Sequence, residues 1–323
     1  MEHTKQKTAE RNEQSFALPK KPQKEKWNFK SDLPFYLLLL PAILIVLIFS
    51  YVPMTGLILA FKDWKPKLGL WGSPWAADGI FSNFKMLFST PELAQSIWNT
   101  FYFNVVTTLF EFPAPIILAL LINEIQNKYF KKTVQTISYL PHFLSIIAIT
   151  GIVNSLLSQY GIVNSVLSKL GLPNQTLLEQ PGAFLPVYII TSVWKSVGWG
   201  TIIYLATLCG LSQETYEAAE IDGAGRFKQA LYITLPGIMP TVGMLLILKM
   251  GSLFGSSFEF VYGLQNPIGW TQDVIATTVY KNGVTQGEYA VSTALGLMQG
   301  AVALILTFGA NFISKRVSEV SMW

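Results

Sequence analysis

Charged and hydroxyl side chains interrupt two otherwise apolar stretches of the sequence. Lys195 and Lys249 stand near the middle of these stretches. A lysine at the centre of a membrane helix costs about 2.5–3.5 kcal/mol on insertion scales, so it usually faces a pathway or an opposite charge. Three interpretations of Lys249 stay open: an ion pair with Glu111 or Glu259, an edge residue whose ammonium reaches the membrane surface, and a positive charge in a translocation path. For Lys195, a structural role and a pathway role are both open.

Hydroxyl and aromatic side chains recur near both lysines at helical spacing. Ser192, Ser196 and Trp199 follow one another after four and three residues, which places them on the helix face that carries Lys195. An aromatic ring beside hydroxyl and charged hydrogen-bonding groups suits a sugar, so this face and its counterpart on the second stretch are predicted to line a substrate pathway. The alternative is that the small residues only pack helices together. The counterpart face on the second stretch carries Lys249, Ser252, Ser256 and Glu259.

Residues for covalent or metal chemistry are scarce. The sequence contains one cysteine, Cys209, and two histidines, His3 and His142. These numbers exclude an internal disulfide framework, a cysteine-cluster metal site and most histidine metal sites. The sequence offers no nucleophile–base pair and no G-x-x-x-x-G-K-[ST] phosphate loop. We therefore expect no enzyme activity, no metal and no cofactor in this chain.

The composition places these residues in a membrane protein. Of the 323 residues, 51% are hydrophobic and 13% are charged, against about 25% charged residues in a soluble domain. A membrane span needs about 20 apolar residues, and its backbone must satisfy its own hydrogen bonds, which favours helices. The predicted fold is all-α, a polytopic membrane protein with six transmembrane helices, of which the first covers about 33–53. Only four charged residues lie in the stretches 33–61, 97–122, 134–157, 183–209, 237–264 and 289–313.

The lysines and arginines outside these stretches predict the orientation. Fifteen of them lie in the terminal segments and the loops on the same side, and six lie in the loops on the other side. Because basic residues favour the cytoplasmic side, both termini are predicted to be cytoplasmic. Residues 1–30 are expected to form a disordered basic tail, and residues 31–323 the transmembrane domain. The opposite loop at 62–96 contains three tryptophans that suit a belt at the membrane interface: Trp64, Trp71 and Trp75.

The loop at 210–236, on the predicted cytoplasmic side, has the pattern of two helices joined by a turn. Ser212 can cap a helix over 213–221, and acidic residues near its start suit the positive end of the helix dipole. The Asp-Gly pair at 222–223 permits a turn, and apolar residues continue until Pro236 stops the pattern. The loop is amphipathic, so it either docks on a separate partner or forms a plain loop at the membrane interface.

The spacing in this loop resembles the EAA loop of binding-protein-dependent ABC importer permeases. The family pattern is Glu-Ala-Ala, three residues, Gly, nine residues and Ile-x-Leu-Pro, and every fixed element is present between Glu217 and Pro236. In that family the loop is the coupling helix, which sits in a cleft of the cytoplasmic ATPase subunit. The resemblance implies an ATPase-docking element that consists of Glu217, Ala218, Ala219, Asp222, Gly223 and Pro236.

The resemblance extends over nearly the whole chain beyond the tail. The chain is similar to oligosaccharide and polysaccharide permeases of the sugar-importer class, which implies the type I importer fold, with five core helices and one N-terminal helix. The segments that carry this likeness are Asn-Glu-Ile at 123–125, Ser-Tyr-Leu-Pro-His-Phe at 138–143, Trp194 to Tyr204, Gln-Asn-Pro at 265–267 and Ser-Met-Trp at 321–323.

The same resemblance implies the assembly and the function. The implied partners are a second, homologous permease, two copies of an ATPase that bind ATP and Mg, an extracytoplasmic sugar-binding protein and membrane lipid, with no nucleic acid. The implied function is ATP-driven import of an oligosaccharide across the inner membrane by alternating access. The two lysines extend this expectation to an acidic cargo of the uronate or alginate kind. The alternatives are a neutral oligosaccharide, if Glu111 or Glu259 neutralises the lysines, and an ion-coupled secondary transporter, for which these two carboxylates are too few.

Overall fold

The computed structural model describes residues 29–171, 173, 175–180, 182–255, 258–265 and 271–317. Within these residues, regular structure is helical apart from one isolated antiparallel bridge between Lys62 and Trp75. The chain divides into two compact units, Met1–Thr55 and Gly56–Trp323. The predicted tail lies outside the described residues up to residue 28, as do Ser256 and the family segments at 266–267 and 321–323.

The described part of the first unit is one helical rod. It consists of α2 (Phe29–Val46), the π-helical turn η2 (Leu47–Tyr51) and α3 (Val52–Met54). Every side chain from residue 33 to residue 55 is exposed. A helix that is apolar on all its faces is suited to hydrocarbon, as predicted for a helix at 33–53.

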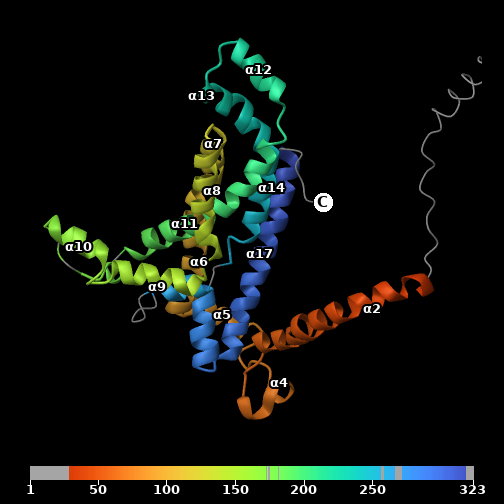
Figure 1. Ribbon diagram of the computed structural model, residues 1–323. Coiled ribbons are helices and arrows are strands. Elements are labelled where there is room, and N and C mark those ends of the chain that lie inside the picture. The colour runs from red at the N-terminus through yellow and green to blue at the C-terminus, as the bar shows by residue number, and fades with distance from the viewer. Residues whose placement is uncertain are drawn as a thin grey trace, which may run out of the picture. The chain divides into compact units, whose positions relative to one another are not determined.

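The second unit is a bundle around the central helix α11 (Phe184–Leu208), which packs against α6, α7, α8, α14 and α15 (Figure 1). Helix α17 packs beside α14. The order along the chain is η3 (Thr55–Phe61), η4 (Pro66–Leu68), α4 (Gly69–Gly72), α5 (Ser82–Ser89), α6 (Pro91–Glu111), α7 (Pro113–Asn123), α8 (Lys128–Phe143), α9 (Ile146–Leu157), α10 (Ile162–Lys169), η5 (Leu177–Glu179), α11, α12 (Gln213–Ile221), α13 (Arg226–Gln229), η6 (Ala230–Thr234), α14 (Leu235–Gly251), α15 (Phe258–Leu264), α16 (Ile275–Thr278), η7 (Val279–Thr285) and α17 (Tyr289–Val317).

Close approach of α11 to α8 depends on Gly198. A Cβ atom at this position would overlap the backbone of Ser138 in α8, so only glycine permits this packing. Towards one end of α11, an apolar core forms where Tyr204 meets Ala119 of α7 and Ile238 of α14. Towards its other end, Phe184 and Tyr188 pack with residues of α6, α9 and α15. The central helix therefore packs against neighbours towards both ends, while Ile190, Trp194 and Trp199 stay exposed.

Five helical stretches in the described part of the chain are long and apolar enough to cross a membrane, against six predicted. They are Asp32–Phe61, Pro91–Asn123, Ile146–Lys169, Arg226–Gly251 and Tyr289–Phe312. The predicted span at 183–209 forms α11, whose 25 residues reach about 37 Å, although it is not among these five. Its polar residues Ser192, Lys195 and Ser196 are half-buried in the bundle.

Two of the predicted continuous helices are wrong, because each is broken near its middle. The stretch 134–157 divides into α8 and α9, with extended backbone at Leu144 and Ser145 and with the Ser145 hydroxyl capping α9 through the Ala148 N–H. The stretch 237–264 divides into α14 and α15, because Gly251 and Ser252 end the first helix in a turn. Glycine and capping residues have therefore overridden the apolar pattern in both stretches.

Candidate functional site

Five helices, α6, α7, α8, α11 and α14, meet around a cleft at the level of these breaks. It has a volume of about 250 Å³ and is lined by Glu111 of α6, His142 of α8, Trp199 of α11 and Lys249 of α14, among others. Helices α8 and α14 end here, α6 passes into α7 through Phe112, and α11 continues through. Proline contributes to one of these ends, since Pro113 offers no N–H to continue α6 into α7.

Lys249 forms an ion pair with Glu111. Its Nζ lies 2.7 Å from Glu111 Oε2, and the two side chains are 32% and 19% exposed. The Ser192 hydroxyl donates to the other carboxylate oxygen at 3.4 Å. Lys249 lies in the last turn of α14, where the helix dipole favours a cation, and Glu111 lies where α6 passes into α7. Each charge therefore has a partner, and the ion-pair interpretation of Lys249 with Glu111 is confirmed.

Lys195 is held by backbone carbonyl groups instead of a carboxylate. Its Nζ donates to the carbonyl oxygens of His142 at 3.0 Å and Leu144 at 3.1 Å. These oxygens lie at the broken C-terminal end of α8, where no continuing helix supplies N–H donors. A cation at a helix C-terminus also complements the dipole. The geometry accounts for Lys195 as a cap that stabilises the break between α8 and α9.

An aromatic stack forms another wall of the cleft. The rings of Trp199 and His142 are parallel within 3°, with centroids 4.4 Å apart, and Phe143 meets Trp199 edge-on. Ser196 lines the same cleft. The sequence pattern does not indicate a place for His142 in this cleft. Pro141, one residue before it, was the signal that the helix ends here.

The structure brings together only part of the predicted pathway. Ser192, Lys195, Ser196, Trp199 and Lys249 lie around the cleft. The shared face of Lys249, Ser252 and Glu259 is wrong, because the helix ends at Gly251: Ser252 lies in the following turn and donates to the Lys249 carbonyl, and Glu259 lies on α15. Ser256 lies outside the described residues.

The loop between α11 and α14 forms a helical hairpin at one end of the second unit (Figure 1). Gly223 ends α12 with φ +76°, a left-handed conformation that favours glycine. The Gly223 N–H donates to the Glu220 carbonyl and the Ala224 N–H to the Ala219 carbonyl. This pair of bonds is a Schellman motif. It explains why a glycine stands at position 223, four residues after Ala219.

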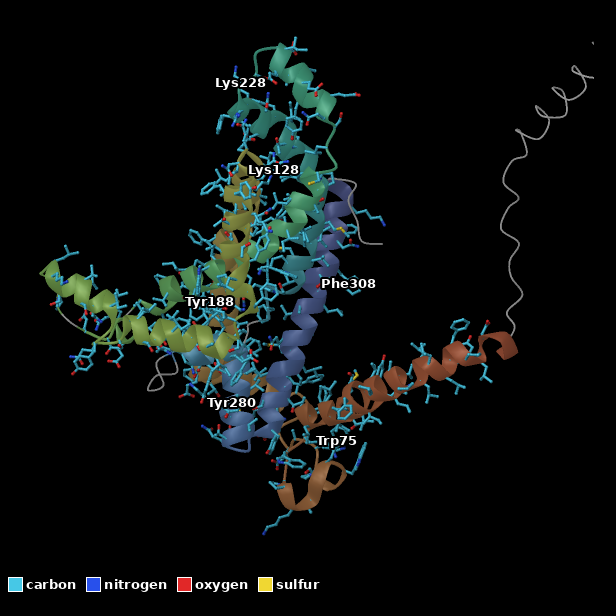
Figure 2. The ribbon with its side chains drawn as sticks, in the orientation of Figure 1. Trp75, Lys128, Tyr188, Lys228, Tyr280 and Phe308 are labelled. Carbon is cyan, nitrogen blue, oxygen red and sulfur yellow. The ribbon has the colours of Figure 1, made fainter. Side chains whose placement is uncertain are left out.

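The hairpin presents apolar and acidic side chains to its surroundings. Ile221 and Phe227 are 87% and 82% exposed, and Lys228 marks the position of α13 in Figure 2. Glu217, Ala218, Asp222 and Gly223 are also exposed, and Ala219 is half-buried. The hydroxyl of Tyr216 in α12 donates to Thr234 of η6 at 2.9 Å. This bond attaches the hairpin to the helical stretch that continues into α14.

Pro236 does not end the helix, contrary to the prediction. Residues Arg226–Gly251 form one helical stretch in which α13, the π-helical turn η6 and α14 follow without a gap, and Pro236 is near the start of α14. A π-helical turn relaxes the regular hydrogen-bond pattern immediately before the proline, where an N–H is missing. Pro236 therefore affects the start of α14, which follows the α12–α13 hairpin, and not the turn at the tip of that hairpin.

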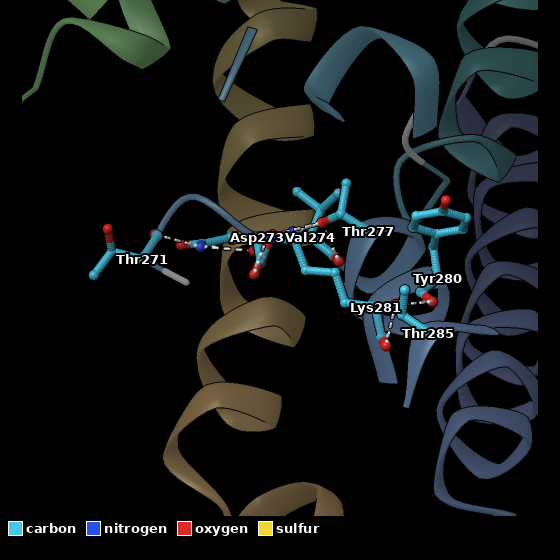
Figure 3. A network of polar contacts seen from close by, with 8 residues as sticks. Thr271, Asp273, Val274, Thr277, Tyr280, Lys281 and Thr285 are labelled. Atoms are coloured by element: carbon cyan, nitrogen blue, oxygen red, sulfur yellow. Dashed lines mark hydrogen bonds and ion pairs between the residues drawn. The ribbon is translucent and has the colours of Figure 1, made fainter. Parts of the chain in front are cut away.

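A second polar network, which the sequence did not indicate, lies between α6 and the start of α16 (Figure 3). Lys281 Nζ lies 2.7 Å from the carboxylate of Asp273, and Thr277 donates to the same group. The Asn99 amide of α6 donates to the carbonyl oxygens of Thr271 and Asp273. The network ties residues that are far apart in the sequence, and its charges are internally compensated. In the described part of the chain, no cluster of three His, Cys, Asp or Glu residues could hold a metal ion.

Comparison with known proteins gives a consistent result. Residues 111–319 match the family model described as "Binding-protein-dependent transport system inner membrane component". The chain is 42% identical to Protein LplB of Bacillus subtilis (strain 168), over 91% of this chain and 92% of LplB. It is 39% identical to the polygalacturonan/rhamnogalacturonan transport system permease protein YteP of the same organism, over 89% of each chain.

A solved structure of a transporter chain is similar to this chain over most of its length. It is a chain from a bacterial ABC transporter involved in the import of the acidic polysaccharide alginate, with a TM-score of 0.82, 40% identity, and 90% of this chain and 98% of that chain covered. A second structure of an alginate ABC transporter, in complex with an alginate pentasaccharide-bound periplasmic protein, has the same TM-score at 39% identity and covers 91% of this chain and 98% of that chain. With its helical bundle and its complete EAA loop, the chain belongs to the family of inner membrane components of binding-protein-dependent transport systems, as an ABC importer sugar permease of type I fold.

Proposed function

We propose that this chain is the permease subunit that moves an acidic oligosaccharide into the cell, driven by a separate ATPase. The observation that carries the proposal is the exposed α12–α13 hairpin, in which the EAA residues precede the Schellman turn at Gly223. A helical hairpin at one end of the second unit, with Ile221 and Phe227 uncovered, suits docking on a partner protein.

The partners of the proposal are those of a complete importer. A second, homologous permease completes the half-pathway of one core bundle. Two ATPase copies bind ATP and Mg and receive the hairpins, and an extracytoplasmic binding protein delivers the cargo. The complex of a similar transporter with its periplasmic binding protein supports the last of these. The hairpin lies on the cytoplasmic side in this proposal, together with both termini, which agrees with the excess of basic residues in those segments.

The acidic cargo is supported by the relatives more than by the lysines. The solved neighbours import alginate, and YteP is named for polygalacturonan and rhamnogalacturonan. Within this chain, Lys195 is used as a helix cap and Lys249 is paired with Glu111. Lys249 can meet a cargo carboxylate only if this pair opens. The Trp199–His142 stack and Ser196 supply the apolar plate and hydroxyl that a sugar ring needs.

One observation favours a neutral oligosaccharide as the second candidate. Glu111 and Lys249 are 2.7 Å apart and cancel each other's charge in the cleft. With this pair neutralised, the electrostatic preference of the cleft for a uronate is weak, because the remaining cation beside it, Lys195, is directed at backbone carbonyl groups.

Uptake by the reconstituted importer separates the two candidates. The purified permease pair, ATPase and binding protein are placed in proteoliposomes with acidic or neutral oligosaccharides of equal length. ATP-dependent accumulation of the acidic sugar is the expected result. Accumulation of the neutral sugar alone would support the second candidate, and uptake that follows a proton gradient instead of ATP would contradict both.

A further inference from the structure

Residues 62–75 form a closed hairpin directly after η3, here called the Lys62 hairpin. Its base is an antiparallel bridge, in which the Asp63 N–H donates to the Pro74 carbonyl at 3.0 Å and the Ala76 N–H to the Phe61 carbonyl at 3.2 Å. The Asn83 amide of α5 donates to the carbonyl oxygens of Ala60 and Lys62. The base is therefore fixed to the second unit by backbone and side-chain bonds.

The interior of the hairpin is strapped by Lys62 itself. This lysine is only 4% exposed, and its Nζ donates to the carbonyl oxygens of Leu70 at 2.8 Å and Trp71 at 3.2 Å. The ammonium also lies 5.4 Å from the centre of the Trp75 ring, within cation–π range. A lysine is rarely buried unless its charge is compensated. The three contacts hold the tip of the hairpin in one conformation.

The rigid tip presents apolar side chains outward. Leu68, Trp71 and Trp75 are 53%, 75% and 56% exposed. Lys65 and Lys67 beside them are exposed as well, and the Lys65 ammonium lies 3.6 Å from the Asp63 carboxylate in an exposed ion pair. Trp75 is labelled in Figure 2. By contrast, Trp64 is turned into the unit, where its ring meets Tyr289 edge-on at 6.0 Å. The structure thus separates the three tryptophans of this loop into one packing residue and two outward-facing ones.

The hairpin begins where the first span ends. That span covers Asp32–Phe61, and Lys62 is the next residue along the chain. Within the second unit, α4 at the hairpin tip and the α12–α13 hairpin lie at opposite ends (Figure 1). Tryptophan and lysine together suit the boundary between headgroups and acyl chains, because the ring is amphipathic and the ammonium reaches the phosphates.

We propose that the Lys62 hairpin is a membrane-interface anchor whose occupant is phospholipid. Leu68 and Trp71 enter the boundary between headgroups and acyl chains, and Lys65 and Lys67 lie near the phosphates. The leaflet is the extracytoplasmic one, which rests on the orientation in the proposed function, whereas the contact with lipid does not. The anchor would fix the depth of the bundle at the surface where the binding protein delivers its cargo.

Spin-label accessibility tests this proposal. Cys209 is the only cysteine in the chain, so Cys209→Ser gives a clean background for a nitroxide at Leu68→Cys, with Asp78→Cys in the exposed stretch beyond the hairpin as the matched control. The complete importer is placed in nanodiscs of phosphatidylethanolamine and phosphatidylglycerol. Collision with oxygen, which concentrates in lipid, is compared with collision with a water-soluble nickel chelate.

The expected result is several-fold lower nickel accessibility and higher oxygen accessibility at position 68 than at position 78. Nickel accessibility equal at both positions would mean that the tip is in water. Low accessibility of position 68 to both reagents would mean that protein covers it. Either outcome would overturn the proposal. Lys62→Met, which removes the strap, should raise the mobility of the label at position 68, and unchanged mobility would contradict the role assigned to Lys62.

Discussion

Replacing Gly223 with alanine should weaken coupling to the ATPase without unfolding the bundle. Gly223 has φ +76°, and an L-residue in the left-handed region costs about 1–2 kcal/mol. A Cβ atom at this position would meet nothing within 4 Å, so the cost is conformational and steric clash adds nothing. This free energy corresponds to about a five- to thirtyfold change in an equilibrium constant. We therefore expect ATPase affinity to fall by up to about that factor.

The chain supplies its own controls for this experiment. Gly225 also lies in the turn, but its φ is −68°, so Gly225→Ser should be tolerated at this helix N-cap. Gly223→Asn should have a smaller effect than Gly223→Ala, because asparagine tolerates the left-handed region. The assay is ATPase binding to the purified permease pair, followed by uptake in proteoliposomes. Equal ATPase affinity in Gly223→Ala and Gly225→Ser would refute the role given to the Schellman turn.

Three further predictions concern the contacts around the cleft and the hairpin. Lys195→Met removes two charged hydrogen bonds at the end of α8 and should destabilise the purified complex by about 1.5–3 kcal/mol; a thermal midpoint equal to that of the wild type would speak against the cap. Glu111→Gln should lower the unfolding free energy of the complex more than the double variant Glu111→Gln with Lys249→Met does. We expect a coupling energy of about 1–3 kcal/mol between the two positions, below that of a fully buried pair because both side chains are partly exposed. Additive effects of the two substitutions would show that the ion pair contributes nothing. Tyr216→Phe should lose about 0.5–1.5 kcal/mol of hairpin stability with its bond to Thr234 and should lower ATPase stimulation by the binding protein. Unchanged stimulation would contradict the role of the Tyr216–Thr234 bond in coupling.

The membrane character, the helical class and the helical hairpin in the loop at 210–236 were predictable from the sequence. Charge-free stretches and a fixed motif spacing are local signals, and the turn at Gly223 was indicated by its Asp-Gly pair. The breaks at Leu144 and after Gly251 were not predicted. An apolar stretch of membrane length hides a break when the interrupting residues are small or when the N-cap is a serine.

The pairing of Lys249 could be narrowed to a few partners but not decided by the sequence. Glu111 precedes it by more than a hundred residues, and only the packing of the bundle brings their side chains together. The cap formed by Lys195 was out of reach for a related reason. It depends on backbone carbonyl groups that become available only because the predicted helix at 134–157 is broken between α8 and α9. Sequence patterns identify lysines that are unfavourable in a membrane helix, but the packing of the bundle determines their interaction partners.

The central claim is ATP-driven import of an acidic oligosaccharide, and one uptake measurement tests it most directly. Proteoliposomes that contain the complete importer, with the binding protein on the outside and ATP inside, are supplied with uronate oligosaccharides or with neutral oligosaccharides of equal length. We predict ATP-dependent accumulation of the uronate sugar, abolished when the ATPase is omitted. Accumulation of the neutral sugar alone, or uptake of the uronate sugar that continues without the ATPase, would contradict the account.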